Sequence, residues 1–329
     1  MKIIQFLHGN QIGGMEKFCL DLSNSLSGEH QIMLIADPVF RAYCKEDISF
    51  VALDVEKSRN NPMFLLALYR EIKAFQPDII HQHKQNSIQI MKRLAPFLKM
   101  PFVATKHDTQ KKKAFYGLKY AISISDETTK TIKAENIYKI YNGIPYREPK
   151  KIKMSDTFNI VAVGGLRKVK GYDSLIDAVS KLPFDFHLTI IGEGSERKAL
   201  EKCIEESGLK DKVSLVGFKE NVQDYLYSSD LQIISSLSEG FSLSMVEGIF
   251  YAPLLLSTKV SGCTEILSDE LLYDIERLDS KIIDVFENYD RYKDHFKVLK
   301  DKHKEQLTID MCAKEHEKVY HSIMKDFHG

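Results

Sequence analysis

The chain has 329 residues and no net charge at neutral pH, and its 43% hydrophobic and 28% charged residues are an ordinary composition for a soluble globular protein. This length exceeds what one hydrophobic core usually serves, so we expect two domains of roughly 150 residues each. The five cysteines are scattered without a C-x-x-C pair, and no stretch reaches the roughly 18 apolar residues of a membrane helix. These features argue against a disulfide framework, a zinc site and a membrane span.

The first half alternates short apolar runs with amphipathic stretches of helical length, a rhythm typical of parallel sheets with helical crossovers. The opening apolar run is too short for a signal peptide and is typical of a buried first strand, so we expect a cytoplasmic protein. The predicted strands are 3–7, 31–36, 49–53, 78–81, 102–105, 120–124 and 138–141, and the predicted helices are 15–26, 62–75, 87–98 and 126–134.

A polar, basic segment at 146–155 contains Pro149 and lacks apolar periodicity, so we interpret it as a linker between domains. Two α/β domains that each begin with a strand and a glycine-rich turn predict a ligand site in a cleft between them. In the second half the predicted strands are 159–163, 187–191, 213–216, 231–234 and 254–256. The predicted helices are 172–182, 195–207, 222–228 and 243–250, with a charged helical tail from residue 279.

A glycine-rich, basic turn follows the strand predicted at 159–163. Glycine backbone N–H groups, a helix N-terminus and nearby cations together favour a diphosphate site, although an ordinary turn with a solvated basic surface is the alternative. The chain has neither G-x-x-x-x-G-K-[ST] nor G-x-G-x-x-G, so a P-loop enzyme or a nicotinamide dehydrogenase is not expected. The turn contains Gly164, Gly165, Arg167, Lys168, Lys170 and Gly171.

Two glutamates, Glu239 and Glu247, stand eight positions apart around a predicted turn and helix start. The backbone N–H groups of Phe241 to Leu243 are placed to meet phosphate oxygens, and a carboxylate such as Glu247 can accept hydrogen bonds from paired ribose hydroxyls. The alternative is a first-turn glutamate that complements the helix dipole and a loop carboxylate that caps the helix.

Three histidines lie at the ends of predicted strands in the first half. His81 and His83 alternate along one strand, and for them a structural role is favoured over a catalytic one. They do not form a metal site without a third ligand. His107 is the better candidate for a direct role, because the carboxyl end of a parallel strand faces the crevice in such folds.

In this order and spacing, the motifs resemble those of the GT-B glycosyltransferases, specifically the retaining family 4, also called group 1. The resemblance implies an α/β fold of two Rossmann-like, doubly wound domains, 1–150 on the acceptor side and 151–308 on the donor side, with a cleft between them. It also implies that a helix at 309–329 crosses back to the first domain. The motifs are GGME at 13–16, DIIHQH at 78–83, TKHD at 105–108, YNGIP at 141–145, the turn at 164–171, LTIIGEGSERKALE at 188–201, SEGFSLSMVE at 238–247, SGCTEIL at 261–267 and LTIDM at 307–311.

The resemblance also implies roles for individual residues. Glu247 matches the glutamate that binds the nucleotide ribose, Glu239 the glutamate near the donor sugar, and Lys170 the lysine that neutralises the leaving diphosphate. His107 matches a first-domain histidine that faces the donor sugar. The other donor-binding residues that it implies are Phe241, Ser242 and Leu243 on the diphosphate, Gly192 and Gly194 in the nucleotide pocket, Phe218 and Lys219 near the base, and Gly13 and Gly14 opposite the diphosphate.

The chain departs from the family pattern in the donor half. Gly165 stands where the family commonly has an arginine, and Arg167, two positions on, is the candidate to reach the same phosphate. Ser242 replaces a usual glycine, which is tolerable if its φ stays negative. The segment 248–251 replaces a run of small residues, and 268–273 follows where a proline- and glycine-rich segment is usual.

The activity implied by the resemblance is transfer of a hexose from a nucleotide-diphosphate sugar to a hydroxyl acceptor with retention, in cell-envelope polysaccharide or lipopolysaccharide assembly. No cofactor is expected besides this co-substrate, and no metal is expected because the chain has no D-x-D run. A GT-B-type sugar-nucleotide epimerase or phosphorylase and a non-catalytic, degenerate partner remain the alternatives.

The two halves differ in charge, with 22 Lys and Arg against 15 Asp and Glu in 1–150 and 24 against 31 in 151–329. A basic half favours an anionic partner, which suggests a glycan or lipid-linked acceptor and a peripheral contact with the inner membrane. An uneven solvated surface is the alternative. Nucleic acid is not expected, because the chain carries no recognised motif. The cations considered for this contact are Lys92, Arg93, Lys99, Lys106, Lys111, Lys112 and Lys113.

Overall fold

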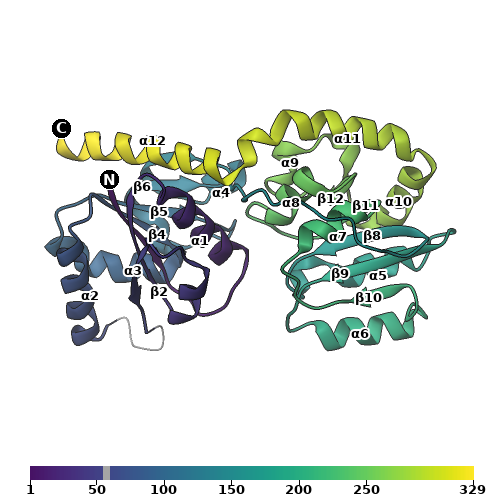
Figure 1. The fold of residues 1–329 in the computed structure, drawn as a ribbon, viewed down its shortest axis with the longest axis horizontal. Helices are drawn as coiled ribbons and strands as arrows, with labels where there is room; N and C mark the ends of the chain where they lie inside the picture. Colours follow the sequence, from purple (N-terminus) through teal and green to yellow (C-terminus); the bar gives the residue numbers. More distant parts are fainter. Residues whose placement is uncertain (55–59) are drawn as a thin grey trace. The chain divides into compact units, whose positions relative to one another are not determined.

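The computed structural model describes residues 1–54 and 60–329, which form two units (Figure 1). Unit 1 comprises Met1–Pro145 together with Leu307–Gly329, and unit 2 comprises Tyr146–Gln306. Each unit is built around its own parallel sheet with helices packed on it. The predicted architecture, two Rossmann-like, doubly wound α/β units, is confirmed.

The sheet of unit 1 has the strand order β3-β2-β1-β4-β5-β6-β7, and all of its pairings are parallel. The chain winds outward from β1 in one direction and from β4 in the other, so the order reverses between these two central strands. Such a switch point opens a crevice at the carboxyl ends of the strands. The strands are β1 Lys2–Leu7, β2 Gln31–Ala36, β3 Ser49–Ala52, β4 Ile79–His83, β5 Phe102–Lys106, β6 Tyr116–Ser123 and β7 Lys133–Lys139.

Helices cover both faces of this sheet. On one face, Ile4 and Ile80 pack with Ile72 and Met91 in an apolar cluster that α2 and α3 complete. On the other face, α12 from the end of the chain lies beside α1, as Figure 1 shows. The crossing of the C-terminal helix to the first unit is therefore confirmed. These helices are α1 Gly14–Leu26, α2 Pro62–Phe75, α3 Lys84–Leu94, α4 Asp126–Thr129 and α12 Ile309–His328.

The sheet of unit 2 is also parallel, in the order β10-β9-β8-β11-β12-β13, and its switch point lies between β8 and β11. Its strands are β8 Phe158–Val163, β9 Phe186–Ile191, β10 Val213–Leu215, β11 Leu231–Ile234, β12 Leu255–Thr258 and β13 Leu272–Tyr273. Its helices are α5 Tyr172–Val179, α6 Arg197–Glu206, α7 Val222–Ser228, α8 Leu243–Tyr251, α9 Cys263–Ile266, α10 Leu278–Glu287 and α11 Tyr289–His303.

Several predicted elements differ from the structure. The helix predicted at 126–134 is wrong, because α4 ends after one turn and residues from Lys133 onward form β7 against β6. The strand predicted at 138–141 is the end of that same β7. The helix predicted to reach residue 98 stops at Leu94 and continues as a 3-10 turn through Pro96, whose nitrogen has no hydrogen to donate. The short β13 was not predicted.

The segment predicted as a linker runs in extended form along unit 2. The backbone N–H groups of Arg147, Lys150 and Ile152 donate hydrogen bonds to Tyr251 Oη, Asp224 Oδ1 and Ser228 Oγ at 2.8, 2.8 and 2.9 Å. Because its backbone is bonded at every second or third residue, this segment belongs to unit 2 from its first residues. In the part of the chain that the structure describes, no helix combines the length and apolar character needed to cross a lipid bilayer.

Candidate functional site

The motifs of unit 2 meet at the carboxyl edge of its sheet. The glycine- and lysine-rich turn follows β8, the G-E-G segment at 192–194 follows β9, and the loop with Glu239 follows β11. These three strands are adjacent around the switch point, so the fold brings together segments up to seventy-five residues apart in the sequence. An edge of this kind, with several free loops and a helix N-terminus, is the usual ligand site of a doubly wound domain.

Two of these loops touch backbone to backbone. Gly192 has φ 147°, and a Cβ at this position would lie 2.0 Å from the carbonyl oxygen of Gly164. A Cβ at Gly194 would lie 2.3 Å from the carbonyl oxygen of Leu166, whose own N–H donates to Glu193 O at 2.9 Å. Only glycine permits this approach, which fixes the turn after β8 against the turn after β9.

Lys170 and Glu239 form an ion pair at the centre of this edge. The Lys170 Nζ donates to Glu239 Oε1 at 2.5 Å, and Ser236 Oγ donates to the same oxygen at 2.7 Å. Only 13% of the lysine side chain and 14% of the glutamate side chain are exposed. The structure thus joins two predicted catalytic residues into one pair that is largely shielded from water and whose charges cancel.

The predicted phosphate-binding turn begins α8. Ser242 is the N-cap residue of α8, has φ −76°, and its Oγ accepts a hydrogen bond from Met245 N at 3.4 Å. The negative φ explains why serine can replace the family's glycine here. Phe241 packs against Gly262, and Leu243 is the first residue of the helix. Glu247 lies about one turn inside α8 and is 9% exposed.

Arg167 and Phe218 are exposed at the rim of this edge. The Arg167 side chain turns back over the glycines, with its Nε 3.7 Å from the place where a Cβ of Gly165 would be. Phe218 is 66% exposed and follows Gly217, whose carbonyl accepts from Gly192 N at 2.9 Å. Lys219 follows in the same loop. The predicted base-side residues therefore lie beside the predicted nucleotide-pocket glycines.

The glycine loop of unit 1 is held by a partly buried ion pair that the sequence did not reveal. Gly13 caps α1 and Gly14 begins it, and Gly13 N donates to Glu16 Oε2 at 3.1 Å. Glu16 is 5% exposed and contacts the ammonium group of Lys84. Lys84 has φ 73° at the start of α3, a conformation that few signals in a sequence predict.

His107 lies at the carboxyl end of β5, half-buried beside the buried histidines His81, His83 and His316. Its Nε2 is 3.0 Å from His83 Nδ1, and their rings stack with centroids 5.3 Å apart. Burial lowers the pKa of His107 to about 3 and that of His316, on α12, to about 4. Burial also places the pKa values of His81 and His83 well below the ordinary value, so the cluster is neutral at pH 7.

Lys106 does not belong to an exposed basic surface, which corrects the prediction made for it. Its side chain is fully buried, and its Nζ donates to Asp108 O, Asp108 Oδ1 and Gln110 O at 2.7, 2.8 and 2.6 Å. The lysine therefore ties down the loop after β5, next to His107. Lys112 contacts the same aspartate, whereas Lys99, Lys111 and Lys113 are exposed.

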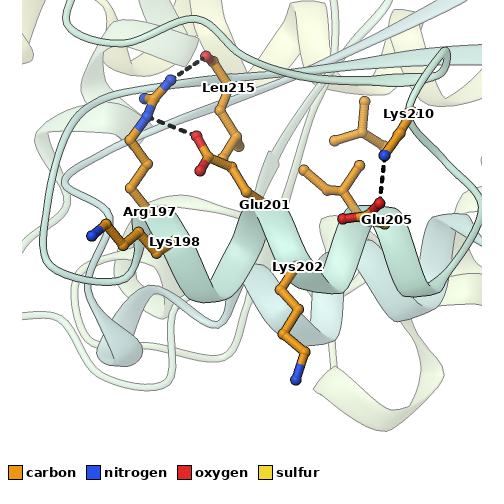
Figure 2. A pocket seen from close by; sticks show the side chains of 9 residues that line it. Arg197, Lys198, Glu201, Lys202, Glu205, Lys210 and Leu215 are labelled. Carbon is orange, nitrogen blue, oxygen red and sulfur yellow. Dashed lines mark hydrogen bonds and ion pairs between the residues drawn. The ribbon is translucent and has the colours of Figure 1, made fainter.

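A separate hollow of about 500 Å³ lies beside α6 in unit 2 (Figure 2). Figure 2 shows two ion pairs among its charged side chains, Arg197 with Glu201 and Lys210 with Glu205. Arg197 Nε is 3.0 Å from Glu201 Oε1, and Lys210 Nζ is 2.5 Å from Glu205 Oε1. Its walls come from α6 and β10 rather than from the loops at the carboxyl edge of the sheet. We therefore place the candidate site at that edge and not in this hollow.

No group of three or more His, Cys, Asp or Glu side chains is arranged to hold a metal ion in residues 1–54 and 60–329. The groups at the edge with the chemistry to bind an anion are backbone N–H groups and the side chains of Lys170 and Arg167. Such a set can hold a diphosphate by hydrogen bonds and charge.

Two family models match nearly the whole chain. Residues 12–147 match the model described as Glycosyltransferase Family 4, and residues 147–308 match the model described as Glycosyl transferases group 1. The boundary between the two matches lies within two residues of the boundary between unit 1 and unit 2. Each model thus corresponds to one structural unit.

Among proteins of known role, the chain is 33% identical over 133 residues to a Campylobacter jejuni enzyme, N-acetylgalactosamine-N,N'-diacetylbacillosaminyl-diphospho-undecaprenol 4-alpha-N-acetylgalactosaminyltransferase. That match covers 39% of this chain and 36% of the enzyme, so the chain spans little more than a third of that relative. It is 25% identical over 300 residues to the lipopolysaccharide core biosynthesis glycosyltransferase LpsD of Rhizobium meliloti, which covers 83% of this chain and 84% of LpsD.

Among solved structures, the chain resembles Anabaena Alr3699/HepE in complex with UDP-glucose, with a TM-score of 0.84 and 18% identity. The similarity covers 98% of this chain and 100% of that one. At this identity it shows only that the two proteins share a fold. The matched family models, the parallel sheet within each of the two units and the shared fold agree with one another. The chain belongs to the group 1 glycosyltransferases of the GT-B fold.

Proposed function

We propose that this protein transfers a hexose from a nucleotide-diphosphate sugar to a hydroxyl acceptor, with retention at the anomeric carbon and without a metal ion. The observation that carries the proposal is the Lys170–Glu239 pair at the switch point of unit 2, beside the N-terminus of α8. A cation, a carboxylate and the backbone N–H groups of a helix N-terminus at one edge are the groups that a sugar diphosphate requires.

In this mechanism the diphosphate displaces Glu239 from Lys170. The lysine and the first N–H groups of α8 then stabilise the negative charge that grows on the leaving diphosphate. Arg167, folded over Gly165, adds a second positive charge. Glu239, once released, is free to accept hydrogen bonds from hydroxyls of the donor sugar, and Glu247 accepts those of the ribose.

The bond between the anomeric carbon and the diphosphate oxygen breaks while a bond forms from the acceptor oxygen to the same carbon. The acceptor hydroxyl approaches on the face that the diphosphate leaves, and its proton passes to the departing phosphate oxygen. This path gives retention without a protein nucleophile. The groups of the protein hold the two partners in place and bind the charge that develops.

We further propose a glycan or lipid-linked acceptor of the cell envelope and a cytoplasmic location. The support is the similarity to LpsD and to an enzyme named for an undecaprenol-linked substrate. UDP is the first nucleotide to test, because a solved structure of the same fold was captured with UDP-glucose. The exposed aromatic ring of Phe218, beside Gly192 and Gly194, offers a surface on which a base can stack.

Calorimetric titration with UDP, GDP, ADP and CMP tests the donor site directly. We expect one diphosphate to bind the wild-type protein and the Glu247→Ala variant to bind it much more weakly. Glu205→Ala, in the hollow beside α6, is the matched control and should bind as the wild type does. If none of the four nucleotides binds, the donor site is degenerate and the proposed activity is wrong.

A further inference from the structure

Three histidines of unit 1, His81, His83 and His107, form one hydrogen-bonded chain with a glutamine and a tyrosine from distant elements. Gln5 of β1 is the register partner of His81 on β4, and His83 lies two residues further along the same face. Tyr320 reaches this face from α12, and His107 reaches it from the end of β5. Four elements thus meet at one polar cluster inside the unit.

Gln5 stands at the centre of this chain. Its Oε1 is 2.8 Å from His83 Nε2, and its Nε2 is 3.3 Å from Tyr320 Oη. From Tyr320 the chain continues to His81 Nδ1 at 2.7 Å and from His81 Nε2 to Thr105 Oγ1 at 2.6 Å. From His83 it continues through Nδ1 to His107 Nε2 at 3.0 Å.

A neutral imidazole has one N–H donor and one acceptor nitrogen. The role of one ring nitrogen in a hydrogen bond therefore determines the role of the other nitrogen. The Gln5 Oε1 can only accept, which places a proton on His83 Nε2 and leaves His83 Nδ1 as an acceptor. His107 must then donate from Nε2, and its Nδ1 carries a lone pair. On the other branch the Gln5 Nε2 donates to Tyr320, whose hydroxyl donates to His81.

The burial of the cluster preserves these donor and acceptor roles at neutral pH. Burial lowers the pKa of every histidine in it, and burial raises the pKa of Tyr320, so the rings stay neutral and the tyrosine keeps its proton. None of these histidines is therefore an imidazolium cation, which would have two N–H donors and no acceptor nitrogen to continue the chain.

We infer that Gln5 is a positioning residue that fixes the tautomer of His107, with the proton on Nε2 and an open acceptor at Nδ1 for a hydroxyl group. In residues 1–54 and 60–329, His107 Nδ1 has no hydrogen-bond partner although it is buried. If the Gln5 amide were turned over, every bond would reverse and Nδ1 would carry an orphaned, buried N–H. Such donors are rarer than unpaired acceptors, which favours the orientation in the structure.

The tautomer decides which chemical group His107 recognises. A lone pair at Nδ1 accepts a hydrogen bond from a sugar hydroxyl, whereas it repels a phosphate oxygen, which has only lone pairs to offer. His107 therefore fits the sugar rather than the diphosphate of a nucleotide sugar. This assignment of the ligand rests on the proposed function, but the tautomer itself does not.

The experiment is long-range ¹H–¹⁵N correlation of the histidine rings in the full-length protein without nucleotide, with His107 identified by the loss of its signals in His107→Gln. We expect a single form of His107, with Nε2 protonated and Nδ1 bare. In Gln5→Met, which has similar volume and no amide, we expect a second set of signals with Nδ1 protonated. Tyr320→Phe removes the acceptor of the Gln5 amide and should give the same mixture if Gln5→Met does not fold.

Ile3→Val is the matched control, because Ile3 lies on the same face of β1, is fully buried and has no polar side-chain atom. It should lower stability and leave the His107 signals in one form. A protonated Nδ1 in the wild-type protein overturns the inference, and so does an unchanged single form in both Gln5→Met and Tyr320→Phe. Because nucleotide is absent, a failure of the proposed activity leaves this result standing.

Discussion

At the scale of single residues, Lys170 is the group on which the proposed chemistry most depends. Its ammonium is held by Glu239 and is largely shielded from water, so it is already aimed at the centre of the edge. The sequence indicated both residues through the motif spacing. It did not indicate that they pair, because a contact between two loops depends on the conformation of each loop in the folded protein.

Replacing Lys170 by alanine should reduce turnover by roughly 10²-fold or more, the usual cost of removing one group that stabilises charge in the transition state. Initial rates of nucleotide release with the donor identified by titration provide the measurement. Lys181→Ala is the control, because Lys181 lies just beyond the end of α5, is exposed and forms an ion pair with Asp177. Equal rates for Lys170→Ala and the wild type would remove Lys170 from the mechanism.

At the scale of elements, the strongly patterned strands and helices were predicted well and the weakly patterned ones were not. The buried strands β1, β2, β8 and β11 are near-continuous apolar runs, as expected where helices cover both faces of a sheet. The edge strand β7 is polar along most of its length, so its sequence resembles a helix as much as a strand. Its conformation is set by pairing with β6, which no local pattern encodes.

In the candidate site, too, some features were predicted from the sequence and others were missed. Strand order and motif position placed the unit 2 loops at one edge correctly, because the carboxyl ends of parallel strands share an edge. The partners of His107 were missed in part: His81 and His83 were noted, but Gln5, His316 and Tyr320 come from elements far away in the sequence. Alternation places Gln5 on a face of β1, but only the fold shows that α12 covers it.

The contact between the loops after β8 and β9 makes Gly192 hard to replace. Gly192→Ala should lower the free energy of unfolding by about 1–3 kcal/mol from backbone strain alone, and overlap with the Gly164 carbonyl adds to this loss. Urea unfolding measures it. Gly208→Ala, at φ 68° with open space around its Cβ, carries only the backbone strain and should lose less. Equal losses at both positions would contradict the proposed backbone contact.

The histidine cluster between the sheet of unit 1 and α12 predicts how stability depends on pH. Its pKa values are lowered on folding, so below the unfolded value of about 6.5 the unfolded chain binds more protons and the fold loses stability. For His316 this loss continues until the pH falls through its folded pKa of about 4. Each such histidine contributes up to about 1.4 kcal/mol per pH unit.

The pH dependence can be assigned to His316 by substitution. Between pH 6 and pH 5, His316→Gln should lose stability less steeply than the wild type, by up to about 1.4 kcal/mol per pH unit. Urea unfolding at several pH values gives the two slopes. Ile323→Val, a buried change on the same helix, should lower stability without altering the slope. A slope in His316→Gln as steep as in the wild type would mean that His316 is not neutral in the folded protein.

At the scale of the whole molecule, the two halves differ in charge, and the first half still presents exposed cations although Lys106 is buried. Exposed cations remain in one region of unit 1, where the 3-10 turns at Ala95–Phe97 and Lys113–Phe115 both pack on α3. Phe97 is 66% exposed in the same region. An aromatic side chain among exposed lysines is suited to an anionic lipid surface.

We expect the protein to bind vesicles that contain phosphatidylglycerol at low salt and to leave them as salt increases, because surface charges are screened within about 10 Å at 0.1 M. The combined Lys99→Ala, Lys111→Ala and Lys113→Ala variant should bind more weakly by roughly fivefold for each lysine, at about 1 kcal/mol per cation near the membrane. The matched control removes three exposed lysines of unit 2, Lys198, Lys202 and Lys210, and so changes the net charge equally. Equal losses in sedimentation with the two variants would mean that net charge, not the surface of unit 1, governs binding; no binding by the wild type would leave uneven surface charge as the explanation.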